Sequence, residues 1–134
     1  MPIQLSVAVR NARLDAIEST IGTAARLRIL TGTRPVDCAA AQTGTLLAEL
    51  VLPSDWMSAA SAGAKALLGS WTGTASAAGT AGYYRILDSA GTTCHEQGTI
   101  TATGGGGDMT VDNTSIANGQ TITVTSKTLT DGNA

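Results

Sequence analysis

Threonine alternates with apolar residues in short runs through the second half of the chain, residues 82–130, and glycine and asparagine separate these runs. Residues 99–103 and 121–125 are two examples. Successive side chains of a strand point to opposite faces, so an alternating pattern is typical of a strand. Threonine is β-branched and also favours the strand conformation. The second half is therefore predicted to form antiparallel β-structure, to which the rest of the chain is added.

Seven segments are expected to be strands, because each is rich in apolar or alternating residues and is bounded by turn-forming residues. Segment 45–52 is almost continuously apolar, which is consistent with a central strand, and a short helix is the alternative. Residues 88–91 predict a hairpin turn between two antiparallel strands. The expected strands are residues 25–31, 45–52, 65–71, 83–88, 92–103, 108–112 and 120–130. This number and spacing indicate an antiparallel β-sandwich or a jelly roll, and we favour the sandwich with its topology open.

Three other segments are predicted to be loops. Residues 33–43 contain Pro35 and several alanines, so we expect a loop there, with room for a short helical turn. Residues 72–82 hold only small side chains before Tyr83, which predicts the most mobile internal loop. The run 104–107 is all glycine and is expected to be a flexible hairpin connection. It does not resemble a phosphate loop, because a strand and not a helix is predicted after it.

The first part of the chain predicts one amphipathic helix, Val7–Ile21. Ser6 can cap its start and Gly22 stands where a helix often ends. Its apolar residues recur at helical spacing and are Val7, Leu14, Ile17 and Ile21. This stripe is narrow, so the helix could lie on its own sheet or on a neighbouring subunit. Residues 1–24 are thus an N-terminal arm and helix, and residues 25–134 the β-sandwich, within a single domain.

The composition limits both the core and the surface. Aromatic residues make up 3% of the chain and phenylalanine is absent, so Leu, Ile, Val and Ala must fill the core. Trp56 follows a proline in a turn and is expected to plug one end of this core. Charged residues are 13% of the chain, about half the usual share, which predicts a polar but weakly charged surface.

Charge and hydropathy argue against two classes of partner. The net charge is -2 and the eight Lys and Arg residues are scattered, so no nucleic-acid partner is expected. No apolar stretch approaches the roughly 18 residues of a membrane span, and no basic segment followed by an apolar run begins the chain. We therefore expect a soluble protein without a recognisable export signal and without a membrane partner.

The two cysteines, Cys38 and Cys94, are too far apart in the sequence to match a zinc or redox motif. We expect both to be reduced and partly buried. A single disulfide is the alternative, which oxidising conditions would favour.

His95 is the only histidine and lies between Cys94 and Glu96. In a regular strand Cys94 and Glu96 share one face while His95 faces the other, so these neighbours cannot form one site. A catalytic dyad would need the fold to bring Cys38 to His95. We expect a structural or interface role for His95.

The acidic residues and the threonines also favour plain structural roles. Asp108 and Asp112 lie on one expected strand, whereas a calcium ion takes about six to eight oxygen ligands. Sugar hydrolysis would need a carboxylate pair in an aromatic-lined cleft, and the chain has four aromatic residues. Threonine ladders occur on ice-binding surfaces and equally on ordinary solvated strands. We predict no enzymatic activity, no cofactor and no metal.

Four segments carry a resemblance to small proteins encoded among the virion genes of tailed bacteriophages and prophages. The segments are residues 11–18 (NARLDAIE) with Ile21 and Gly22, 52–56 (LPSDW), 82–86 (GYYRI) and 99–109 (TITATGGGGDM). The resemblance is one of overall pattern, and it spans nearly the whole chain. Among such proteins, the size and β-rich composition are similar to capsid decoration, or cement, proteins, which sit as dimers or trimers on the head lattice.

The resemblance implies a non-enzymatic structural protein of the virion, assembled in the host bacterial cytoplasm. Its partners would be the major capsid protein or tail proteins and further copies of itself. A tail tube, tip or fibre-associated protein, or a receptor-binding protein, is the alternative. No functional residues carry over, since such proteins act through surfaces. We expect either the helix Val7–Ile21 or the preceding residues 1–5 to supply an arm that docks on a neighbour. The candidate interface residues are Leu5, Val7, Leu14, Ile17, Ile21 and Trp56.

Overall fold

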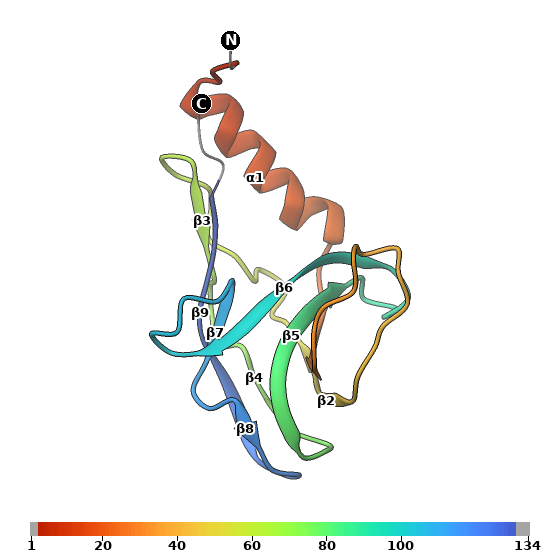
Figure 1. The fold of residues 1–134 in the computed structure, drawn as a ribbon. Coiled ribbons are helices and arrows are strands. Elements are labelled where there is room, and N and C mark those ends of the chain that lie inside the picture. The colour runs from red at the N-terminus through yellow and green to blue at the C-terminus, as the bar shows by residue number, and fades with distance from the viewer. Residues whose placement is uncertain (1–2, 131–134) are drawn as a thin grey trace.

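The computed structural model describes residues 3–130, which form one helix and nine strands (Figure 1). The fold is mainly β with an N-terminal helix, as predicted. The elements are α1 (Val7–Ile21), β1 (Arg26–Thr31), β2 (Leu46–Val51), β3 (Ala64–Ala66), β4 (Thr72–Thr74), β5 (Gly79–Leu87), β6 (Cys94–Ala102), β7 (Met109–Val111), β8 (Ser115–Ile116) and β9 (Thr121–Thr130). The polar sequence of residues 131–134 predicts a frayed tail, but these residues lie outside those that the structure describes.

The strands form one curled sheet in the order β2-β1-β5-β6-β7-β9-β3, with β4 paired to β9 and β8 paired to β5. Figure 1 shows how the sheet curls, so that β5 and β6 stand opposite β9, and α1 lies across one end. Strands β6 and β7 pair in parallel, with Ile100 opposite Met109, whereas all the other pairs are antiparallel. The result is a sandwich-like fold whose antiparallel character is interrupted at this one pair.

The concave face of the curled sheet encloses the hydrophobic core. Leu27, Ile29 and Ile86 are fully buried on β1 and β5, and Ile122 and Val124 face them from β9. Burying one such side chain contributes about 1.5–3 kcal/mol, so this cluster supplies much of the drive to fold.

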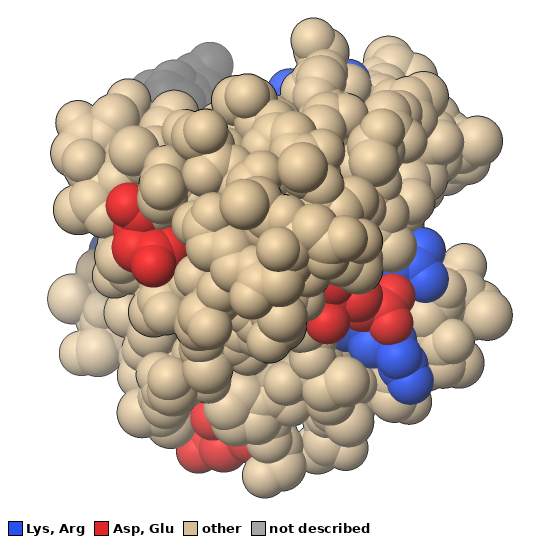
Figure 2. Space-filling model, turned by 90° about the horizontal axis from the view of Figure 1, so that it is seen from below, with Lys and Arg blue, Asp and Glu red and all other residues tan. Residues whose placement is uncertain are grey.

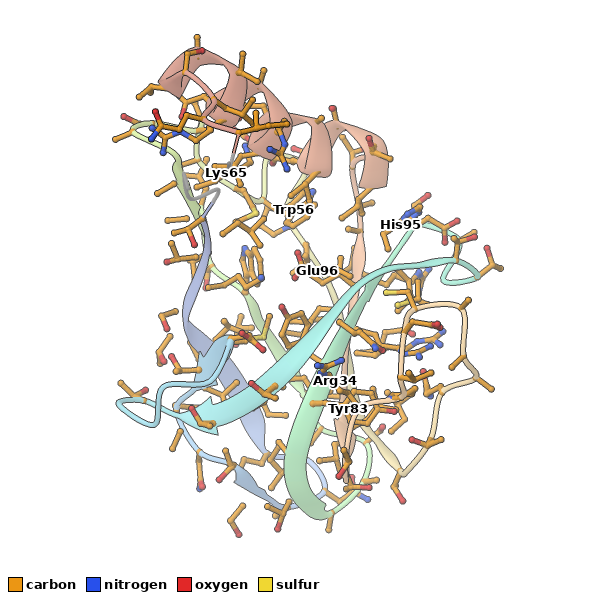
Figure 3. The ribbon with its side chains drawn as sticks, turned by 45° about the horizontal axis from the view of Figure 1, so that its top comes forward. Arg34, Trp56, Lys65, Tyr83, His95 and Glu96 are labelled. Atoms are coloured by element: carbon orange, nitrogen blue, oxygen red, sulfur yellow. The ribbon has the colours of Figure 1, made fainter. Side chains whose placement is uncertain are left out.

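Trp56 fills the end of the core beneath α1, as expected from its place after Pro53 (Figure 3). Its ring centroid lies 5.8 Å from that of Trp71, at an interplanar angle of 53°. The indole Nε1 of Trp56 donates to the Gly22 carbonyl at 3.1 Å. The two tryptophans therefore join the core to the end of the helix.

The opposite face of β1 and β5 is covered by the loop of residues 32–45, named here the covering loop. Tyr83 points to this side, and its hydroxyl contacts the backbone of Thr43. Arg85, also on this side, donates to the carbonyls of Asp37 and Ala40 at 3.2 and 2.8 Å. None of the described residues 33–43 is in a helix, and the loop makes a single hydrogen-bonded turn, in which the Ala40 N–H donates to the Asp37 carbonyl at 3.3 Å. The loop packs as a second cover on the sheet.

The helix occupies the predicted residues because both of its ends are capped. The Ser6 hydroxyl accepts a hydrogen bond from the Val9 N–H at 3.2 Å. At the other end, Gly22 has a φ of 90° and its N–H donates to the Glu18 carbonyl at 2.9 Å. Glycine is favoured there, since a side chain is strained at that φ.

Segment 45–52 does contain a strand, β2, but this strand ends the sheet instead of lying at its centre. Its continuous apolar run has another cause. Leu50 packs against β4, where a Cβ added to Gly73 would lie 2.7 Å from the Leu50 Cγ. Val51, on the other side, stays 61% exposed. Burial by the opposed layer, not by a second neighbouring strand, explains the pattern.

The prediction of a mobile loop at residues 72–82 is wrong, because this segment contains β4 and the start of β5. The backbone between them is also bonded, since the N–H groups of Ala75 and Ser76 each donate at 2.8 Å to carbonyls of Gln120 and Leu47. A Cβ added to Gly82 would lie 2.0 Å from the Gly32 carbonyl oxygen. The small residues therefore mark close packing between strands.

Two further predictions require correction. The strand expected at 65–71 is limited to β3, after which the chain turns to bring Trp71 into the core. The glycine run 104–107 does not close a hairpin, because it connects the parallel strands β6 and β7. A Cβ added to Gly105 would lie 2.6 Å from the Thr101 Cβ, which explains why glycine is needed in so tight a return.

Candidate functional site

The first turns of α1 and the segment before it expose apolar side chains. Ile3 is 81% exposed, Val7 47% and Val9 46%. We call these three residues the apolar N-terminal surface. Single exposed apolar residues are common on proteins, but three within one short stretch mark this end of the molecule as a candidate contact region, although Val7 and Val9, two positions apart, lie on different sides of the helix.

The structure separates the six predicted interface residues into two groups. Val7 is exposed, and Leu5 and Ile17 are partly buried. Leu14 and Ile21 are only 3% and 6% exposed, and Trp56 is fully buried. These last three pack inside the molecule, because they fill the contact between α1 and the core, so a partner cannot reach them while the fold is intact.

Polar side chains of α1 fasten the helix to the segment that leads into β3. Asn11 Oδ1 accepts from the Gly63 N–H at 2.9 Å. Asp15 Oδ1 accepts from the Ala60 N–H at 3.0 Å, and Glu18 Oε2 accepts from the Met57 N–H at 2.9 Å. The polar side of the helix is therefore turned inward at these positions.

Lys65 lies beneath α1 and is 2% exposed (Figure 3). Its Nζ is 2.8 Å from Asp15 Oδ1 and 3.0 Å from Glu18 Oε1, and it also donates to the Ser58 carbonyl at 2.8 Å. Burial alone would lower the pKa of Lys65, but the hydrogen bonds to Asp15 and Glu18 raise it above its usual value. The ammonium group is thus held charged as the link between helix and sheet.

A second buried lysine, Lys127 of β9, pairs with Glu96 of β6. Lys127 Nζ lies 2.7 Å from Glu96 Oε2 and 5.2 Å from the centre of the Tyr84 ring. The Tyr84 hydroxyl donates to the same carboxylate oxygen at 2.7 Å. Burial, then the charge of Glu96 and this hydrogen bond, raise the pKa of Tyr84 far above its usual value. The phenol therefore stays protonated as a donor.

The cluster of Tyr84, Glu96 and Lys127 lines a cavity of about 310 Å³, to which Arg34 and Asp108 also contribute. Both buried donors converge on one oxygen of Glu96, so the carboxylate is already neutralised within the cluster. Asp108 is likewise engaged, since it accepts from the Thr99 N–H at 2.9 Å, and this bond lowers the pKa of Asp108. The arrangement stabilises the contact between β6 and β9.

His95 is exposed and lines a cavity of about 260 Å³ with α1 residues that include Ile17 and Ile21. Cys38 lines a different cavity, together with Cys94. The dyad of Cys38 and His95 that a catalytic role would need is therefore not assembled in this arrangement.

The expectation that Cys94 and Glu96 share a face is wrong, because β6 contains a bulge at this point. Ile86 pairs with Glu96 and the next residue, Leu87, pairs with Cys94, which leaves His95 as the extra residue. Glu96 consequently faces Lys127 in the sandwich, whereas Cys94 faces the covering loop.

The acidic residues of β7 and its flanks bind backbone groups. Asp112 Oδ1 accepts from the Thr123 N–H at 3.1 Å and from the Asn113 N–H at 3.0 Å. Across residues 3–130, no group of three or more His, Cys, Asp or Glu residues is placed to hold a metal ion. Within the same residues, no helix is long and apolar enough to span a membrane.

Sequence reasoning missed Val9 and both buried lysines. Val9 lies outside the heptad-like spacing of Val7 and Leu14, although its position at the helix start could have indicated exposure. Lys65 carried one signal, since it stands alone among small residues at 58–66 and a helix with two acidic residues precedes it. No feature of the sequence indicated that Lys127 is buried, because it continues a run of threonine and serine that predicts a solvated face.

The lower end of the molecule, seen in Figure 2, is largely uncharged, with acidic groups in separate patches and basic atoms beside one of them. This agrees with the low charge content of the chain. Two of the arginines, Arg26 and Arg28, also form ion pairs with Glu49, at 2.7 and 2.6 Å. Such a surface offers apolar and neutral polar groups for contact. Comparisons of the chain with protein-family models, curated proteins and solved structures found no match.

Proposed function

We propose that this chain is a structural protein of a tailed-bacteriophage or prophage virion, a decoration protein that binds the capsid lattice through protein contacts. The resemblance of residues 11–18, 52–56, 82–86 and 99–109 to small virion proteins supports this proposal. The observation that carries it is the exposure of Ile3, Val7 and Val9 at one end of a weakly charged molecule.

The contact chemistry suits attachment to a lattice. Removing apolar area from water contributes about 25 cal/mol per Å², so the apolar N-terminal surface can supply binding energy without a charged partner. Removing a neutral polar group from water costs less free energy than removing an ionised group. Contacts with several neighbours, as in a dimer or trimer on the head, then raise the effective concentration and the overall affinity.

The decisive experiment compares binding of purified protein to virus heads that lack it. The double variant Val7→Asp with Val9→Asp should bind at least about tenfold more weakly, because it places two charges in the contact. The fold should survive, since both side chains are nearly half exposed and acidic residues are favourable in the first turn of a helix. Circular dichroism and the melting temperature check this.

Val36→Asp is the matched control, because Val36 is 86% exposed on the covering loop and is not part of the apolar N-terminal surface. It should bind heads as the unchanged protein does. Head binding by the double variant at full strength would remove the apolar N-terminal surface from the proposal. Recovery of the protein with isolated tails and not with heads would replace the head assignment by the tail-associated one.

A further inference from the structure

The fold brings together the two cysteines that the sequence separates. Cys38 lies on the covering loop and Cys94 begins β6, and both are partly buried with free thiols. They line one cavity of about 260 Å³ next to Arg85. Cys38 is close enough to Cys94 to raise the pKa of the Cys94 thiol.

The position of Cys38 is fixed from both sides by β5 and β6. Arg85 donates to the carbonyls of Asp37 and Ala40, which flank Cys38. Gln97 Nε2 donates to the Pro35 carbonyl at 2.8 Å, further along the loop. The covering loop is thus held over the end of β6 at which Cys94 is the first residue.

The position of Cys94 follows from the bulge at His95. The extra residue turns Cys94 to the side of the covering loop, opposite Leu87, and its Sγ donates to the Glu96 carbonyl at 3.4 Å. Without the bulge, Cys94 would share the face of Glu96 and point into the sandwich.

We propose that Cys38 and Cys94 are a covalent modification site, at which a low-molecular-weight disulfide converts the two thiols into a reversible intramolecular disulfide. The Cys38 thiolate attacks one sulfur of the reagent, and the other sulfur leaves as a thiolate that takes a proton. The Cys94 thiolate then attacks the Cys38 sulfur of the mixed disulfide and releases a second thiol. The protein loses two electrons and two protons, and both go to the reagent.

The order of attack follows from the surroundings of Cys94. Burial, and after it the neighbouring Cys38 thiol, raise the pKa of the Cys94 thiol to about 12, against the opposing charge of Arg85. Cys94 is therefore a poor first nucleophile. Once Cys38 is bound in the mixed disulfide, it is no longer ionisable, and Cys94 can lose its proton without a thiolate beside it.

The disulfide would tie the covering loop to β6 by a covalent bond in addition to its hydrogen bonds. It closes a long stretch of chain between Cys38 and Cys94, which restricts the unfolded state more than a short loop does. We expect the melting temperature of the oxidised protein to rise by about 10 °C over the reduced protein. This inference is independent of the proposed virion function.

The test incubates the folded, reduced protein with oxidised glutathione and follows its intact mass and its thiol count. The expected product has lost two hydrogens, has no free thiol, yields one Cys38–Cys94 peptide on digestion, and reverts with dithiothreitol. The variants Cys38→Ser and Cys94→Ser serve as controls, because neither can close the ring. Cys94→Ser should gain one glutathione, and Cys38→Ser should react more slowly, because only the poorer nucleophile remains.

The unchanged protein decides the outcome, so loss of folding in a variant does not affect the test. Two glutathione adducts, a disulfide-linked dimer, or two thiols that persist at equilibrium would each overturn the proposal. Treatment of the urea-unfolded protein with oxidised glutathione is the control that shows the reagent to be active. A melting temperature that does not rise on oxidation would overturn the inferred tie between loop and sheet.

Discussion

Lys65 and Lys127 are buried to the same degree, since each side chain is 2% exposed, but they are surrounded differently. Lys127 is paired with Glu96, which is 15% exposed, and lies over the ring of Tyr84. Lys65 is paired with Glu18, which is 18% exposed, and with Asp15, which is 49% exposed. Water therefore reaches one side of the Lys65 site.

The difference shows that the degree of burial of a charged side chain does not by itself determine how much that side chain contributes to stability or which elements it holds together. The Lys127 site lies between the two sides of the sandwich, where an unpaired carboxylate would be costly. The Lys65 site joins α1 to β3, so its loss should release the helix before it affects the sheet. Mutations of the two lysines should thus differ in size and in where the structure opens.

The largest effect is expected for Lys127→Ala, which should lower the free energy of unfolding by about 3–5 kcal/mol. It leaves Glu96 buried without its cation, and it removes the stem that packs on Tyr84. Urea denaturation at neutral pH measures the change. Lys127→Met with Glu96→Gln should cost clearly less than Lys127→Ala, because no buried charge remains, and a larger cost would refute this explanation.

Lys65→Ala should lower the free energy of unfolding by about 2–3 kcal/mol, less than Lys127→Ala, because water can solvate part of the released carboxylate pair. Amide hydrogen exchange should become faster along α1 and remain slow in β5 and β6. Equal acceleration in helix and sheet would show that Lys65 belongs to the core in the same way as Lys127.

Local signals made part of this structure predictable. The helix was placed correctly because Ser6 and Gly22 mark its ends and the apolar spacing agrees with them. The hairpin of β5 and β6 was expected from residues 88–91, and the two strands do pair antiparallel. In these places, propensity, capping and periodicity point to the same answer.

Bulges explain much of what the sequence could not reveal about the sites. On β9, Ile122 and Val124 face the core, and a register shift opposite Thr110 and Val111 then turns Lys127 inward as well. The bulge at His95 moves Cys94 in the same manner. One extra residue inverts the faces of all the residues beyond it, and no local residue type identifies where it occurs. The parallel return at 104–107 was hidden for a similar reason, since glycine is also typical of hairpins.

The smallest expected effect is a difference in acid sensitivity. The hydrogen bond from Lys65, then that from the Ala60 N–H, lower the pKa of Asp15 below its usual 3.8. Its folded pKa is therefore below its unfolded value, so its contribution to stability is present above about pH 3.8 and is lost as the pH falls through the folded pKa.

Asp15→Asn should accordingly lose less stability than the unchanged protein when the pH is lowered from about 5 to about 3, which are roughly one unit above and below that value. The urea midpoints of both proteins at these two pH values measure the difference. Asp55→Asn controls for the change in net charge, because Asp55 is exposed and lines the same surface cavity as Asp15. At high pH both proteins should weaken alike, because the raised pKa of Tyr84 stabilises the fold only until the unfolded tyrosine ionises near its ordinary value of 10.0. An unchanged acid response in Asp15→Asn would mean that the half-exposed side of the Lys65 site contributes nothing through ionisation, and that the two lysine sites differ by packing alone.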